Sequence, residues 1–254
     1  MSKLVDTMRR VLRGEGPRMG FGASPSTKQR SMILLAELPS TDPVLASRAV
    51  EQSVDGLFFP LPSGDDFEGI RQVSQLVGAL PWGVQLAAAD RHLLSSLFEM
   101  GCDFLVLSSG SIPLSLLREE KPGKVLQIDG SLSDGLLRAL DQLPIDLVLM
   151  ECGGGDSVTI SDLMNCWRVA MLVRKPLALI ASPHLDPADL PLVRETGVEV
   201  LVVALDGTDS SIEKLGAFRQ AIETLPHRRS SRQQVDATLP LGGLAPPRQS
   251  EDSE

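Results

Sequence analysis

Short apolar segments recur along the chain and are separated by segments in which apolar residues return every three or four positions. The short segments are continuously apolar, which is typical of strands covered on both faces, as in a parallel sheet. The others have the period of amphipathic helices. The predicted strands are 32–37, 56–61, 82–87, 104–108, 124–129, 146–151, 176–182 and 200–205. The predicted helices are 43–53, 66–79, 90–100, 113–119, 133–142, 161–173, 187–195 and 211–224.

This alternation of eight strands with eight helices predicts a single α/β domain, a (β/α)8 TIM barrel with eight parallel strands. Asp42-Pro43 and Asp186-Pro187 each place an N-cap residue before a proline, as at a helix start. The first strand is not followed by a GxGxxG turn, so an open dinucleotide-binding sheet is disfavoured.

Acidic residues introduce every second strand, which predicts a barrel of four βαβα quarters. Chance placement at four sites is the alternative. The residues are Asp55, Asp103, Asp146 and Glu199.

The two ends of the chain differ from the predicted barrel, which spans residues 32–225. Residues 1–31 read as an amphipathic helix and a linker, with Leu4 and Met8 on one face and Arg9 and Arg10 opposite or flanking. We expect the helix to cover the bottom of the barrel; docking on a membrane or a protein partner is the alternative. Residues 226–254 are polar and predict a disordered tail, in which the apolar stretch 237–244 is either a docking motif for a protein partner or a tolerated tail segment.

Composition narrows the functional classes. The net charge of −9 argues against a nucleic-acid partner. Cys102, Cys152 and Cys166 lack CxxC spacing, which disfavours a disulfide framework and a structural zinc site. No apolar run approaches the ~20 residues of a transmembrane helix, and a secretory signal is not apparent, so a cytoplasmic location is expected.

Candidate chemistry lies where the predicted strands end, because active sites of such barrels are built at the carboxyl ends of the strands. Glu37, Asp129 and Glu151 are the candidate catalytic residues, as general acid, general base or ligands of a divalent metal. Solvated loop carboxylates are the alternative. Lysine is absent from these positions, which disfavours Schiff-base aldolase chemistry. The candidate substrate-binding residues are Gln85, Ser108, Gly153, Gly154, Ser182, His184 and Asp206.

The loop after the sixth strand combines a cysteine with three glycines. Gly153 to Gly155 allow the backbone to approach a ligand or an anion closely, although a flexible turn explains them equally well. Cys152 has no histidine near it in sequence to act as a base, so a structural thiol is the better interpretation.

Three segments between residues 145 and 207, IDLVLMECGGGDS, KPLALIAS and GVEVLVVALDG, resemble the last three βα units of aldolase-type barrels, including flavin enzymes of the nitronate monooxygenase kind. The resemblance implies a glycine-rich loop after the sixth strand and glycines after the seventh and eighth that hold the flavin phosphate. This sequence instead has Ser182-Pro183-His184 and Asp206 at those places, and an acid repels a phosphate. We therefore expect no FMN.

Three functions remain open on this evidence. The first is an enzyme that acts on a small metabolite with carboxylates at the barrel mouth. The second is a non-catalytic barrel that serves as a scaffold or binding protein. The third is a barrel that binds FMN or another phosphate-bearing ligand.

Overall fold

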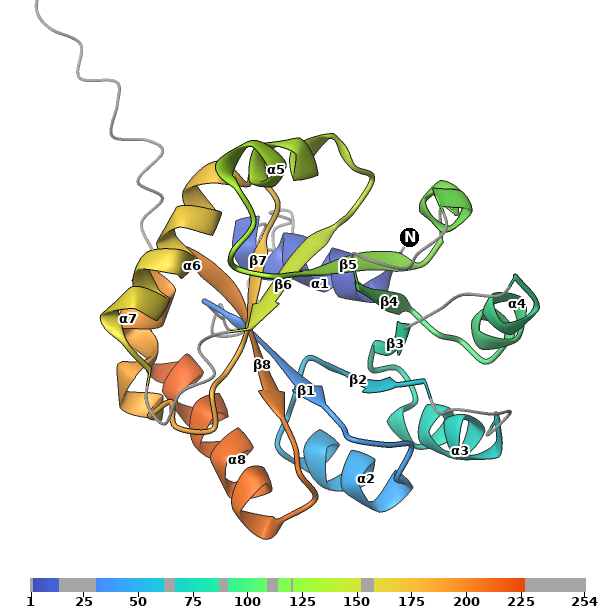
Figure 1. Ribbon diagram of the computed structural model, residues 1–254. Coiled ribbons are helices and arrows are strands. Elements are labelled where there is room, and N and C mark those ends of the chain that lie inside the picture. The colour runs from blue at the N-terminus through green and yellow to red at the C-terminus, as the bar shows by residue number, and fades with distance from the viewer. Residues whose placement is uncertain are drawn as a thin grey trace, which may run out of the picture.

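The computed structural model describes residues 2–13, 31–61, 67–86, 91–108, 114–119, 121–151 and 158–226. Eight parallel strands form a closed barrel in sequence order, and β8 closes onto β1 from Ile33 opposite Val200 to Glu37 opposite Ala204 (Figure 1). This confirms the predicted (β/α)8 barrel. The strands are β1 (Ile33–Glu37), β2 (Gly56–Pro60), β3 (Trp82–Leu86), β4 (Phe104–Ser108), β5 (Gly123–Ile128), β6 (Leu147–Glu151), β7 (Leu177–Ile180) and β8 (Val198–Ala204).

Helices follow the strands and form the outer ring of the barrel, while α1 lies behind the strands in the view of Figure 1. None of the helices in the described ranges is long and apolar enough to cross a membrane. The α-helices are α1 (Lys3–Arg13), α2 (Pro43–Glu51), α3 (Phe67–Val77), α4 (Arg91–Glu99), α5 (Asp134–Ala139), α6 (Ile160–Leu172), α7 (Leu190–Glu195) and α8 (Asp209–Thr224). The described ranges also contain three 3₁₀ turns between strands, η1 (Leu114–Arg118), η2 (Leu140–Gln142) and η3 (Pro187–Asp189).

The structure corrects several predicted elements. The expected helix at 113–119 is only the 3₁₀ turn η1, and the expected helix at 133–142 divides into α5 and η2. The expected helix at 187–195 divides into η3 and α7, because Pro191 has no N–H to donate and its ring clashes with the carbonyl four residues earlier. Strand β8 begins before Glu199, which was expected to precede it. Leu177 lies opposite Val198 and Ala178 opposite Val200, so Glu199 is the extra residue of a β-bulge.

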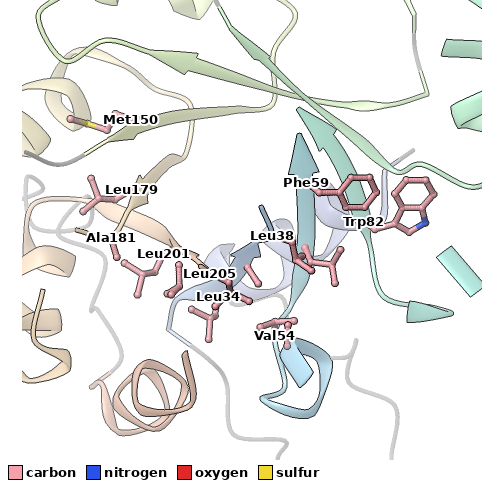
Figure 2. Packing of buried hydrophobic residues seen from close by; sticks show 14 of the residues in the cluster. Leu34, Leu38, Val54, Phe59, Trp82, Met150, Leu179, Ala181, Leu201 and Leu205 are labelled. Atoms are coloured by element: carbon pink, nitrogen blue, oxygen red, sulfur yellow. The ribbon is translucent and has the colours of Figure 1, made fainter. Parts of the chain in front are cut away.

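A hydrophobic layer fills the space between the strands and the outer helices. Figure 2 shows part of it, with Leu34, Phe59, Trp82 and Leu201 among the buried side chains. Phe59 and Trp82 stack with their ring centroids 5.9 Å apart. The alternate residues of the same strands point into the barrel, so both faces of each strand are buried, as the continuous apolar runs predict.

The barrel interior forms a second apolar cluster that includes a helix from outside the βα repeat. Leu4, Val5 and Met8 of α1 join strand residues such as Ile33 and Phe104 in this cluster. The helix therefore covers the bottom of the barrel, where the strands begin, and its apolar face is buried against the barrel interior.

Acidic residues hold the strand starts together at this bottom end. Asp55 donates its N–H to the carbonyl of Leu34 at 2.8 Å, and its carboxylate accepts the N–H of Leu34 at 3.0 Å. Asp146 makes the same reciprocal pair with Lys124, at 2.8 and 2.9 Å. The acidic repeat thus ties even strands to the odd strands before them.

Asp103 occupies the equivalent place but binds α1 instead. Its N–H donates to the carbonyl of Trp82, whereas its carboxylate accepts bonds from the Ser2 hydroxyl at 2.8 Å and from the N–H groups of Lys3 and Leu4 at 2.7 and 2.9 Å. These N–H groups belong to the first turn of α1 and have no partner within the helix. Asp103 therefore acts as an N-cap supplied from another part of the chain.

Replacing Asp103 by alanine should lower the free energy of unfolding by about 2 kcal/mol, because an N-cap and further hydrogen bonds to a carboxylate are lost together. Urea denaturation followed by circular dichroism measures this change. Asp6→Ala, at an exposed carboxylate in the same helix, is the control and should stay within about 0.5 kcal/mol of the parent. Equal effects of the two substitutions would contradict the capping role.

Candidate functional site

Two carboxylates reach the barrel mouth from strands β1 and β6, which are separated by β7 and β8. Glu37 ends β1 and continues the inward series of Ile33 and Leu35, while Glu151 ends β6 and continues that of Leu147 and Leu149. Both side chains therefore occupy the last inward positions of their strands. By the same alternation Gln85, Ser108 and Gln127 are inward positions near the ends of β3, β4 and β5.

The two carboxylates interact electrostatically. Burial raises the pKa of Glu37 above its usual 4.5, and the negative charge of Glu151 raises it further. Glu151 itself is exposed. At the described inward strand positions, the mouth thus contains two carboxyl groups in unlike environments, one partly desolvated and one in contact with water.

Two amide side chains meet inside the mouth. Nε2 of Gln85 donates to Oε1 of Gln127 at 2.9 Å, which fixes the orientation of both amides. The sequence interpretation named Gln85 and overlooked Gln127. The signal was present, because Gln127 is a polar residue at an inward position of an otherwise apolar strand.

A cleft of about 470 Å³ opens beside the mouth, between the ends of β5 and β6 and the helix α6. Glu151 contributes to this cleft as well as to the mouth. Asp129 also lines it, and the carboxylate of Asp129 accepts the N–H of Ser131 at 2.8 Å. The lining residues are Asp129, Gly130, Ser131, Met150, Glu151, Asp162, Asn165 and Arg168.

Two charged residues of α6 shape the cleft wall. Arg168 donates to the carbonyls of Gly130 and Leu132 and pairs with Asp134 at 2.8 Å, so it holds the loop after β5 against α6. The carboxylate of Asp162 accepts the N–H of Thr159 and closes a capping box at the start of α6. Sequence reasoning missed both, because polar residues on a surface helix give no sign that they face a cleft.

Other predicted binding residues lie on the loops after β7 and β8, apart from the carboxylate pair. Ser182 is buried and its hydroxyl accepts the N–H of the exposed His184 at 3.2 Å. Lys214 of α8 donates to the carbonyls of Ser182 and Pro183 and thereby anchors this loop. None of the contacts in the described ranges links these residues to Glu37.

Asp206, in the loop between β8 and α8, is held as an anion. Its carboxylate accepts bonds from the hydroxyl and the N–H of Thr208 at 2.6 and 2.9 Å. These bonds lower the pKa of Asp206 to about 2. Cys152, Gly153 and Gly154 fall outside the described residues.

The predicted catalytic trio is connected through Glu151, which acts electrostatically on Glu37 and shares the cleft lining with Asp129. None of the contacts in the described ranges joins Glu37 to Asp129. Nor do those ranges contain three or more His, Cys, Asp or Glu side chains placed to share a metal ion. The catalytic assignment of the three carboxylates stays a prediction.

Solved structures of other proteins share this architecture. A thiamine phosphate pyrophosphorylase from Pyrococcus furiosus has a TM-score of 0.60 at 13% sequence identity, over 76% of this chain and 96% of that chain. A tryptophan synthase from Mycobacterium tuberculosis has a TM-score of 0.62 at 15% identity, over 87% of this chain and 98% of that chain. Similarity at such identities shows the fold alone. No protein-family model matches the sequence, and no curated protein is significantly similar to it.

The raised pKa of Glu37 predicts how stability changes with pH. Charged Glu37 destabilises the folded state above its folded pKa, and this penalty disappears as the pH falls through that pKa toward 4.5. Glu37→Gln should therefore raise the melting temperature at pH 7 to 8, with a gain that shrinks as the pH approaches 4.5. Glu213→Gln, at an exposed position of α8, is the control for the loss of one negative charge. A gain that is independent of pH, or absent, would show that Glu37 is not desolvated.

Proposed function

We propose that this barrel is an enzyme that transfers protons to and from a small polar metabolite bound at its mouth. Glu37 is the general acid and Glu151 the general base. The observation that carries the proposal is the pair of carboxyl groups at the last inward positions of β1 and β6, one with a raised pKa beside the charge of the other. Pairs of titratable groups in unlike environments are typical of acid–base sites.

The surroundings of each carboxyl group suit its role. Partial burial of Glu37 favours the protonated form that can donate, and the exposed Glu151 is open to a substrate from the cleft side. The bonded amides of Gln85 and Gln127 offer a fixed donor and acceptor pattern for polar groups of the substrate. Ser108 adds a hydroxyl at the end of the neighbouring strand β4.

The cleft fits a ligand of metabolite size, since ligand sites commonly enclose roughly 300 to 1,000 Å³. We place Asp129 at its edge as the residue that orients polar groups next to Glu151. Gly153 and Gly154 remain predicted backbone contacts in the loop after β6. The neighbours named above carry the names of enzymes, which is in keeping with the proposal but assigns none of these residues.

A non-catalytic barrel is the second candidate function. The observation in its favour is an apolar face on the outside of α6, which is of a kind used for binding other proteins. A barrel that binds FMN or another phosphate is less favoured, because the anion of Asp206 lies where α8 begins and the amide groups of a helix start would otherwise attract a phosphate. The apolar tail segment 237–244 stays a predicted docking motif for a partner.

Proton transfer can be tested with mixtures of small polar compounds. The full chain is incubated in D₂O with defined mixtures of small hydroxy, keto and amino acids and polyols, and deuterium uptake or product formation is followed by proton NMR. We expect turnover of at least one compound, reduced roughly 10²- to 10⁴-fold by Glu37→Gln and by Glu151→Gln, since positioned acids and bases contribute factors of this size. Glu213→Gln should retain the parent rate.

Two results would contradict the proposal. One is turnover that survives both glutamine substitutions. The other is ligand binding, seen as a rise in melting temperature, without any exchange or product, which would favour the binding-protein candidate. Melting of Glu151→Gln and the parent with and without Mg²⁺, Mn²⁺ and Zn²⁺ separates a metal role. If a metal ion raises the melting temperature of the parent but not that of Glu151→Gln, Glu151 is a metal ligand and the acid–base proposal is wrong.

A further inference from the structure

The outward face of α6 is apolar along its whole length. Ile160, Met164, Trp167 and Met171 are 77%, 65%, 60% and 74% exposed. The opposite face of the helix packs into the core through residues such as Val169. The helix therefore carries two apolar faces, of which the barrel uses one.

The exposed residues, which we call the α6 stripe, follow the spacing of a helix–helix interface. Their intervals of four, three and four residues are those of the a and d positions in a heptad repeat, which place side chains in one row along a helix. Both charged residues within α6 have other partners: Asp162 caps the start of the helix, and the guanidinium of Arg168 is bound to the loop after β5 and to Asp134. The row thus presents apolar side chains without a charge between them.

A convex row of this kind fits another helix better than an extended peptide, because side chains of two helices interdigitate along their length. Other exposed large apolar residues of the described helices do not form such a row. Val44, Leu76, Leu136 and Leu192 are each the single such residue on α2, α3, α5 and α7, Leu114 is the single one on η1, and Leu143 follows the end of η2. The described part of the chain therefore contains one surface that matches the α6 stripe, and that surface is the α6 stripe of a second copy.

The exposed apolar area of the stripe is also of the order found in protein–protein interfaces. Each of its four side chains exposes on the order of 150 Å², and together they approach the upper limit of about 600 Å² for an apolar patch on a monomer. A standard interface buries roughly 800 Å² per partner, so the stripe by itself accounts for about three quarters of one side of such an interface. A central Trp flanked by Met is moreover the composition found in the core of such interfaces.

We infer that the protein is a homodimer in which the α6 helices of two copies pack antiparallel about a two-fold axis. In this arrangement Trp167 of each copy lies against Met164 of the other, and Ile160 lies against Met171. A parallel arrangement would instead set the two Trp167 rings directly against each other. Antiparallel packing also brings opposite ends of the two helix dipoles together.

The oligomeric state of the full chain in solution tests this inference. Sedimentation velocity should give twice the mass of the chain, and Trp167→Glu should raise the dimer dissociation constant at least about tenfold, because a charge is then buried at the centre of the interface. Val44→Glu, at a similarly exposed apolar residue on α2, is the control and should remain dimeric. Melting curves show whether each variant is folded, and Met164→Glu serves if Trp167→Glu is not.

A monomeric parent, or a dimer unaffected by Trp167→Glu and Met164→Glu, would overturn the inference. The tail segment 237–244 is the other candidate occupant. If the parent is a monomer and Leu241→Glu increases the quenching of tryptophan fluorescence by iodide, the tail is the segment that covers Trp167. The change would report on Trp167 because Trp82 is buried in the core. In the dimer, I160C and M171C combined in one chain should cross-link two copies on oxidation, whereas I160C alone should not, because only a parallel arrangement places position 160 against itself. Cross-linking of I160C alone, or none in the double variant, would overturn the antiparallel arrangement.

Discussion

Closure of the barrel is the constraint on which the rest of this structure depends. Once β8 pairs with β1, every strand has one face inside the barrel and one against the helices, so both faces need apolar side chains. The interior must also be closed at the bottom, and α1 does this with Leu4, Val5 and Met8. Polar chemistry is then confined to the last inward positions at the mouth, where Glu37 and Glu151 lie.

The constraint explains why the fold could be predicted from the sequence. Buried strands produce continuous apolar runs, and helix starts such as Asp42-Pro43 produce capping signals, both of which the structure confirms. The acidic repeat was recognised as a regularity, but its cause was not visible. Asp55 and Asp146 bind the strands before them, whereas Asp103 binds α1. These different roles depend on contacts between residues up to 101 positions apart in the sequence.

In the candidate site, only the residues whose position follows from the two-residue period of a strand could be predicted from the sequence. The ends of β1 and β6 follow from the apolar runs, and with them the positions of Glu37 and Glu151. The electrostatic coupling of these residues depends on the closed circle of strands, which sequence spacing does not describe. Arg168 and Asp162 were missed for a related reason, since only the packing of α6 against the loop after β5 brings their helix to the cleft.

Helix α6 connects the two proposals. One side of it lines the cleft through Asn165 and Arg168, and the outer face carries the α6 stripe. A partner helix on the stripe would therefore hold the cleft wall in place, whereas the mouth depends on strands alone. Acid–base chemistry and dimerisation are for this reason separable by substitution, although one helix serves both.

The central claim is that Glu37 is a desolvated acid under the influence of Glu151. Carbon-13 NMR titration of the glutamate side-chain carboxyl groups in the full chain measures this directly, with Glu37→Gln used to assign the resonance. The account predicts that Glu37 titrates above 4.5 in the parent and that its pKa falls toward 4.5 in Glu151→Gln, without reaching it, because burial is the larger cause of the shift. A pKa of 4.5 or lower for Glu37 in the parent, or one that Glu151→Gln leaves unchanged, would contradict it.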